Sequence, residues 1–366
     1  MSNVIKIPRS LNKLLETCNT VSTKDNYVQR IEKFHEFIEI GLDELVKLDH
    51  KEIDDIVTDY ILSIKHRYNP NSIPTMIAPV KAFLEMNDIL INWKKLFRFF
   101  PDKVKVSGQS AWKTEDVQKM LNFSRKLSTR AMIHLLASTG CRAGGIVGLQ
   151  IKHVTNMDHG YKMITVYAGD KEEYVTFLTP EASFAYDEHI KSRMDRGENV
   201  DAESYVFVQK NGRPVDRHAM YMVLKYVTVN ANLRGDMVTG AVKGGRYRTQ
   251  LCHGFRKRFN TVMKLNNEVN DNAIEKMMGH KNGLDGTYLQ IPHEMLLENF
   301  MKGAIDLTVS DEHRLKLETI ELQKEKQELE AQIQEAIKLQ DEKIERLQRR
   351  VAEAKFTDDR EGGKLD

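Results

Sequence analysis

The chain has 366 residues, of which 41% are hydrophobic and 30% charged, so it can bury a core and is not disordered overall. At ~150 residues per domain, this length predicts two to three domains. Its apolar runs fall short of the ~18–20 residues of a membrane span, and the N-terminus lacks the apolar stretch of a secretory signal. Three widely spaced cysteines exclude a disulfide framework and a four-cysteine zinc site, which predicts a reducing, cytoplasmic location.

Charge is distributed unevenly along the chain. Residues 311–366 hold 12 Lys and Arg against 16 Asp and Glu, a net charge of −4, which leaves residues 1–310 at +6. Within that body a 31-residue window, 237–267, holds seven basic residues and no acidic one: Lys243, Arg246, Arg248, Arg256, Lys257, Arg258 and Lys264. Such a window indicates either a polyanionic partner or a solvated basic face.

Residues 1–103 are predicted to form a helical domain. Two apolar stripes recur at spacings of three and four, which is typical of amphipathic helices. Their members are Tyr27, Ile31, Phe34 and Ile38 in the first, and Ile53, Ile56, Tyr60 and Ile64 in the second. Pro, Gly and Ser then coincide with a loss of periodicity, so we expect a linker at 104–110.

Residues 111–308 are predicted to form a second, mainly helical domain with one small sheet. The stretch 161–179 has alternating apolar residues on either side of Gly169 and Asp170, as in a β-hairpin. The fold class expected for the whole chain is therefore mainly α (α+β).

Residues 311–355 contain no Gly or Pro and are rich in Glu, Lys, Leu, Gln and Arg. Apolar residues recur there every seven positions, with an irregularity at Ala336 and Ile337, which predicts a coiled-coil helix. Whether this helix pairs with another copy or packs on the body stays open at this point. Residues 356–366 are expected to form a disordered tail.

Four short motifs occur in a fixed order along the second domain. They are TGCRAGGIVGL around Arg142, GDKEEY around Lys171, CHGFRKRF with His253 and Arg256, and MMGHKNGLDGTYL with His280 and Tyr288. Each residue taken alone has an ordinary structural explanation, such as a surface arginine or a capping histidine. In this order, the set resembles the catalytic domain of tyrosine recombinases, the phage-integrase and Xer-like family, and the chain looks most like its archaeal members on plasmids, viruses or chromosomes.

The resemblance implies a role for each motif residue. Arg142 and Arg256 would hold the scissile phosphate, because a guanidinium stays charged and presents two N–H groups to phosphate oxygens. His280 would donate to another non-bridging oxygen, and Lys171 would protonate the leaving 5′ oxygen. Tyr288 would be the nucleophile, with His253 as its proton acceptor.

The implied reaction keeps the phosphate bond energy in a covalent 3′-phosphotyrosine, so that neither ATP, a metal nor any other cofactor is expected. No Walker loop or HExxH motif occurs in the sequence. A zinc site built from Cys141, Cys252, His253 and His280 is an alternative, but its spacing fits no known signature.

One position departs from the family pattern. The family commonly has an acidic residue three positions after the first arginine, where this chain has Gly145. We therefore expect another group to orient Arg142, and a looser local structure, because glycine lowers helix propensity.

The expected partner is double-stranded DNA carrying a specific recombination site. We expect phosphate contacts from five basic residues, Lys243, Arg246, Arg248, Lys257 and Arg258. The resemblance implies a core-binding domain at 1–103, a catalytic domain at 111–308, and a tetramer on two DNA sites that is a dimer or monomer off DNA. Integration, excision or dimer resolution of DNA is the expected outcome, in the cytoplasm near the nucleoid. A transposase or resolvase with the same chemistry, and an architectural DNA-binding protein without catalysis, are the alternatives.

Overall fold

The computed structural model of the protein describes residues 7–104, 110–235, 247–280 and 290–361, with side chains described as far as residue 350. The chain divides into two compact units. The first consists of residues 1–110 together with 234–250, and the second of 111–233 together with 251–366. The mainly α (α+β) fold class predicted from the sequence is confirmed.

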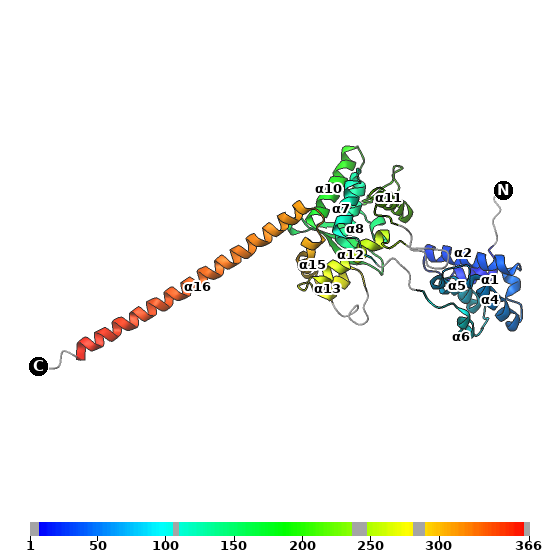
Figure 1. The fold of residues 1–366 in the computed structure, drawn as a ribbon, viewed down its shortest axis with the longest axis horizontal. Coiled ribbons are helices and arrows are strands. Elements are labelled where there is room, and N and C mark those ends of the chain that lie inside the picture. Colours follow the sequence, from blue (N-terminus) through cyan, green and yellow to red (C-terminus); the bar gives the residue numbers. More distant parts are fainter. Residues whose placement is uncertain (1–6, 105–109, 236–246, 281–289, 362–366) are drawn as a thin grey trace. The chain divides into compact units, whose positions relative to one another are not determined.

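The first unit is a cluster of helices (Figure 1). Its helices are α1 (Arg9–Leu15), α2 (Val21–Ile38), α3 (Leu42–Leu45), α4 (His50–Lys65), α5 (Ile73–Met86) and α6 (Trp93–Leu96). Short 3₁₀ helices lie at Pro70–Ser72 and Phe97–Phe99. The predicted apolar stripes do face its core, since Ile31, Phe34 and Ile53 are fully buried there.

Polar side chains fix the starts of the two longest helices in this unit. The hydroxyl of Thr20 accepts a hydrogen bond from the backbone N–H of Thr23, 3.2 Å away, at the start of α2. Asp49 accepts from Lys51 N–H, and the Glu52 side chain accepts from Asp49 N–H, which forms a capping box at the start of α4. These bonds satisfy N–H groups that a helix start leaves without partners.

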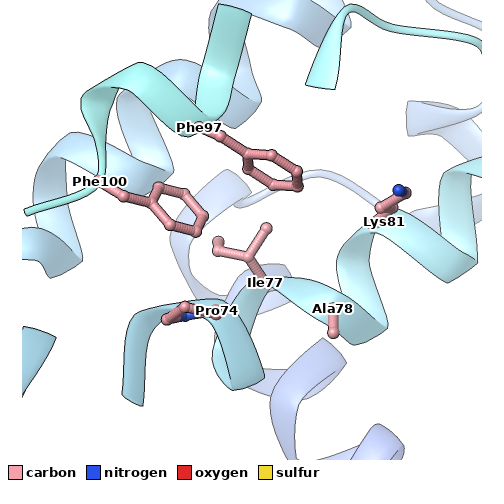
Figure 2. Close-up of a pocket in the computed structure, with 6 residues that line it drawn as sticks. All are labelled: Pro74, Ile77, Ala78, Lys81, Phe97 and Phe100. Atoms are coloured by element: carbon pink, nitrogen blue, oxygen red, sulfur yellow. The ribbon is translucent and has the colours of Figure 1, made fainter. Parts of the chain in front are cut away.

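A pocket of about 240 Å³ lies between α5 and the segment that contains the 3₁₀ helix Phe97–Phe99 and Phe100. Figure 2 shows the rings of Phe97 and Phe100 above Ile77, with Lys81 at one side. The Lys81 ammonium lies 5.8 Å from the ring centroid of Phe97. This pocket is therefore apolar, with one cation held by aromatic faces.

The second unit is built around α8 (Leu127–Thr139), in which every residue from Ala131 to Thr139 is buried. Helices α10 (Pro180–Asp195), α12 (Leu251–Leu265) and α7 (Thr114–Asn122) pack against it. Among the described residues of this unit before 308, the other helices are α9 (Ala143–Val147), α11 (Arg217–Asn230), α13 (Asp271–Met277) and α15 (His293–Leu307). Short 3₁₀ turns lie at Ile151–His153 and Asp158–Gly160.

The small sheet is antiparallel, in the order β1 (Val154–Asn156), β2 (Lys162–Val166) and β3 (Tyr174–Leu178). Strands β2 and β3 form the predicted hairpin, with Val166 paired to Tyr174. Both Thr176 and Phe177 of β3 are fully buried, because helices cover β3 on both faces.

Helix α16 spans Asp311–Glu361 and is drawn as the long orange-to-red helix in Figure 1. The helix runs past residue 355, so the prediction that the chain is disordered from residue 356 is wrong for residues 356–361. The Glu181 carboxylate accepts hydrogen bonds from the backbone N–H groups of Val309 and Ser310, which fixes the start of α16 to the second unit. Within the described residues, no helix is both long and apolar enough to span a bilayer.

Candidate active site

Arg256 stands at the centre of the candidate site, on the buried side of α12. Its side chain is only 6% exposed. Nη1 donates to the carbonyl oxygen of Gly140 at 3.0 Å, and Nη2 donates to that of Met278 at 2.6 Å. These carbonyls follow the C-terminal ends of α8 and α13, where the helix dipole favours a cation. Two helix ends that are far apart in sequence therefore fix this guanidinium.

His280 lies beside Arg256. Its Nε2 atom is 2.7 Å from Nη2 of Arg256, and its Nδ1 atom is 2.5 Å from the Glu275 carboxylate. Because a guanidinium only donates, Nε2 accepts this bond, and Nδ1 carries the proton that is donated to Glu275. The imidazole is thus held between one cation and one anion.

Gly279 makes this position of His280 possible. Its φ angle is +64°, in the left-handed region, and a Cβ there would lie 2.4 Å from the Tyr174 ring. The backbone N–H of His280 then donates to the carbonyl of Glu275 at 2.9 Å, which closes the turn after α13. Any larger residue at position 279 would displace the turn from β3.

Arg142 is the N-cap residue of α9 and is exposed. Its positive charge lowers the pKa of both Arg256 and His253, for which burial is the larger cause. Arg142 therefore lies within electrostatic reach of both residues. The structure thus gathers four of the predicted residues, Arg142, His253, Arg256 and His280, in one region of the second unit.

Gly145 occupies the position where the family commonly has an acid. Position 145 is buried, and a Cβ there would lie 2.4 Å from Cγ1 of Val166 in β2. The glycine therefore lets α9 pack directly on the sheet. The expectation of a looser segment is wrong, because close packing on β2 takes the place of the missing side chain.

His253 projects from the exposed side of α12, one turn before Arg256. Burial lowers its pKa from the ordinary 6.5, and the charges of Lys257, Arg256 and Arg142 lower it further. A neutral imidazole at pH 7 is able to accept a proton.

Lys171 lies in the exposed turn between β2 and β3. This turn is fixed by its own hydrogen bonds, since Asp170 N–H donates to the carbonyl of Tyr167 and Gly169 N–H donates to the Glu173 carboxylate. The hairpin that carries Lys171 is the one on which Gly145 packs.

The predicted DNA contacts differ in their surroundings. Lys257 is half-buried on α12, and Arg248 is exposed in the first unit. Arg258 is only 2% exposed, and its guanidinium donates to the carbonyls of Ala137 and Asp306. The prediction that Arg258 contacts DNA is therefore wrong, because this side chain joins elements inside the second unit.

Three predicted residues, Tyr288, Lys243 and Arg246, lie outside the described residues. The assignment of Tyr288 continues to rest on the sequence motifs, and that of Lys243 and Arg246 on the basic window 237–267. Gln290 is the first described residue after the stretch that contains Tyr288.

Two further polar side chains near the site were not predicted from the sequence. Tyr167 has a φ of +56°, which is unusual for a bulky residue and costs backbone energy. Burial raises the pKa of Tyr167, whereas the charges of Arg142, Arg217 and Arg256 act to lower it. A Cβ at Gly144 would lie 2.7 Å from Arg217 Nη2 and 2.9 Å from the Tyr167 hydroxyl, so both groups meet beside α9.

The sequence contained little to mark these two residues. Arg217 follows Asp216 at an ordinary helix start, and Tyr167 reads as the end of a strand. Glu275, which contacts His280, was also missed, although a carboxylate five residues before the histidine at a helix end is a recognisable signal.

Two cysteines lie near the site, and both are held as thiols. Burial raises the pKa of Cys252 to about 11 and also raises the pKa of Cys141, whose sulfur accepts a hydrogen bond from the Tyr174 hydroxyl. In the parts of the chain that the structure describes, no three His, Cys, Asp or Glu residues are grouped to hold a metal ion.

The sequence and the fold of this chain are similar to those of known proteins. Residues 112–285 match the phage integrase family. This match and the curated relatives support the resemblance to tyrosine recombinases that the motifs suggested.

Two curated relatives are tyrosine recombinases named XerD. The one from Staphylococcus aureus (strain Mu50) is 26% identical over 196 residues, which cover 52% of this chain and 58% of that protein. The one from Halalkalibacterium halodurans is 24% identical over 171 residues, which cover 45% of this chain and 52% of that protein. The chain thus spans about half the length of the curated relatives it matches.

Among solved structures, the XerH site-specific recombinase bound to its difH substrate in a pre-cleavage complex is similar to this chain. The TM-score is 0.52 and the identity 15%, over 79% of this chain and 82% of that chain. At this identity the likeness establishes a common fold.

Proposed function

We propose that the chain is a site-specific DNA recombinase that cuts and rejoins duplex DNA through a covalent 3′-phosphotyrosine at Tyr288. The phenol oxygen attacks the scissile phosphorus, the bond from phosphorus to the 5′ oxygen breaks, and that oxygen leaves as a hydroxyl. In rejoining, a 5′-hydroxyl of another strand attacks the phosphotyrosine and releases the phenol. The exchange conserves one phosphodiester bond, so it balances without ATP or another co-reactant.

The fixed guanidinium of Arg256 is the observation that carries this proposal. Attack on a phosphodiester takes the non-bridging oxygens from one negative charge toward two. A donor held in place beforehand pays no reorganisation cost as that charge develops, and one such donor contributes roughly 3–4 kcal/mol. The carbonyls of Gly140 and Met278 hold Arg256 in this way, and His280 adjoins it.

The remaining residues take their roles around Arg256. Arg142, exposed and within electrostatic reach of Arg256, is the second donor to the phosphate. His253, whose pKa is lowered, accepts the proton of the attacking phenol. Lys171, at the exposed tip of the β2–β3 hairpin, protonates the leaving 5′ oxygen.

His280 has a more specific role than the sequence suggested. Its Nε2 atom accepts a hydrogen bond from Arg256, whereas donation to a phosphate oxygen requires a proton on that same atom. In our proposal His280 keeps this hydrogen bond and positions the Arg256 guanidinium, whose remaining N–H groups donate to the phosphate. Glu275 holds the other nitrogen throughout.

Duplex DNA with a specific site is the proposed substrate, and the XerH complex with difH is the neighbour that supports it. Lys257 and Arg248 would contact phosphates, which makes affinity salt-dependent. The proposed working unit is a tetramer on two DNA sites, and integration, excision and dimer resolution all use this chemistry. A transposase or resolvase would share it.

A suicide DNA substrate tests the proposal. A nick near the scissile phosphate lets the short 5′ end diffuse away, so that cleavage leaves protein joined to DNA. We expect an adduct with the natural chain and none with Tyr288→Phe, while DNA binding is retained. Tyr167→Phe is the matched control, because Tyr167 is the described phenol beside Arg142 and Arg217, and this variant should still form adduct. Binding without any adduct in the natural chain would instead favour the architectural alternative.

A further inference from the structure

Helix α16 carries a stripe of exposed apolar side chains. Every residue from 321 to 350 is exposed, and the apolar ones include Leu322, Leu329, Ile333, Ile337, Ile344 and Leu347, each at least 50% exposed. Most of the stability of a protein helix comes from packing of its apolar face, so a helix this long and exposed calls for a partner.

The spacing of this stripe follows two heptad frames. Positions 322, 326, 329 and 333 alternate in steps of four and three, and so do 337, 340, 344 and 347. Between the frames, 333 and 337 are separated by four residues where the first frame would place three. This is a stutter, which locally unwinds a coiled coil without ending it.

We propose that α16 pairs with α16 of a second copy of the chain in an antiparallel coiled coil, whose two-fold axis passes between Ala336 and Ile337. Residues equally distant from that centre then face each other in the core. The facing pairs are Ala336 with Ile337, Ile333 with Gln340, Leu329 with Ile344, and Lys326 with Leu347. Three core positions of the first frame, 326, 329 and 333, are the mirror images of 347, 344 and 340 in the second frame, so the two-fold axis lies beside the stutter.

Core polarity selects the antiparallel direction. In a parallel pair in register, Lys326 would lie against Lys326 of the other copy in the core, and like charges there are unfavourable. In the antiparallel pair Lys326 lies against Leu347. The Lys326 ammonium also retains its ion pair with the Glu330 carboxylate of the same helix, 3.7 Å away.

The charges that flank the core agree with this direction. A parallel pair would place Glu325 across from Glu330, two like charges on each side. The antiparallel pair places Glu325 across from Arg350 instead. The antiparallel pair also brings Glu330 near Asp341 of the other copy. The repulsion between these two carboxylates is offset by Lys326, which forms an ion pair with Glu330.

Antiparallel pairing has a geometric consequence for the recombinase units. At 1.5 Å per residue, the two copies of Asp311, where α16 begins, lie about 75 Å apart at opposite ends of the coiled coil. The pairing therefore joins two copies without using the face that contains Arg256 and His280.

Cysteine cross-linking of the full chain tests the direction. Leu329→Cys and Ile344→Cys chains of different tag length are co-expressed and oxidised, with the natural chain as the control for its own cysteines. We expect a disulfide-linked species that contains one chain of each kind, and none when either variant is oxidised alone. Cross-linking of Leu329→Cys to itself would overturn the antiparallel arrangement.

The association state tests the pairing itself. By sedimentation without DNA, the natural chain should be a dimer, and the double variant Leu329→Glu, Ile344→Glu should be a monomer. Leu339→Glu is the matched control, since Leu339 is equally exposed, at 54%, but lies off the stripe, and this variant should stay dimeric. A monomeric natural chain, or a double variant that stays dimeric, would overturn the proposal.

Discussion

The Nδ1 atom of His280 donates to the carboxylate of Glu275 at 2.5 Å, and the same carboxylate lies 2.5 Å from the ammonium of Lys264. Glu275 precedes His280 by five residues on α13, so the helix and its terminal turn bring the two side chains together. This relationship fixes which imidazole nitrogen faces Arg256.

Replacement of Glu275 should misplace His280 without removing it. We expect Glu275→Ala to lower the rate of adduct formation roughly 10–100-fold at saturating DNA, because small misplacements of catalytic groups are costly. Glu275→Gln should retain more activity than Glu275→Ala, since the amide oxygen still accepts from Nδ1. Lys264→Met, which leaves the His280 bond intact, is the control, and a natural rate in Glu275→Ala would contradict the role.

The pH profile of cleavage should report on His253. A proton acceptor must be neutral, and the pKa of His253 is lowered from the ordinary 6.5 by burial and by Lys257, Arg256 and Arg142. The rate should therefore stay level as pH falls toward 6.5 and decline only below it. Removal of one positive charge raises the pKa again, so Lys257→Gln should shift the decline to higher pH at saturating DNA. A decline that stays in place in both Lys257→Gln and His253→Gln would assign it to another group.

Lys257 and Arg258 are adjacent in sequence and should behave differently on DNA. Loss of one phosphate contact reduces the slope of log affinity against log salt by about one, which we expect for Lys257→Ala. Arg258→Ala should leave the slope unchanged, because the side chain is buried. It should lower the free energy of unfolding by about 2–4 kcal/mol through lost packing and hydrogen bonds. A reduced salt slope in Arg258→Ala would show that this guanidinium reaches DNA after all.

Stability toward acid should depend on His134. Burial lowers the pKa of His134 to about 4, although Glu181 opposes the shift, whereas the unfolded chain has the ordinary value of 6.5. Between pH 6.5 and 4 the unfolded state binds a proton that the folded state does not, so stability falls as pH falls through this window. The loss from this group is on the order of 3 kcal/mol. Chemical denaturation of the natural chain and His134→Gln at pH 7 and pH 4.5 measures it, and equal losses in both chains would contradict the assignment.

Helices and the hairpin could be predicted from the sequence because their signals are local. The stripe at Ile31 and Phe34 and the alternation around Gly169 each lie within one element. The order of the motifs was likewise sufficient to predict that Arg142, His253, Arg256 and His280 share one region.

The environment of each side chain could not be predicted in the same way. Arg256 and Arg258 are both arginines of one basic run, yet one faces the candidate site and the other joins α8 to the end of α15. That difference depends on the rotation of α12 against its neighbours. The fit of Gly145 on Val166 also arises only when the sheet meets α9, and no local pattern in the sequence marks the positive φ of Tyr167.

Identification of the residue joined to DNA tests the central claim most directly. The adduct formed on the suicide substrate is digested with protease and nuclease, and the nucleotide-bearing peptide is sequenced by mass spectrometry. We predict a 3′-linked phosphate on Tyr288 and a free 5′-hydroxyl on the released strand. A phosphate on Tyr167 or any other residue, or a linkage to the 5′ end, would contradict the account.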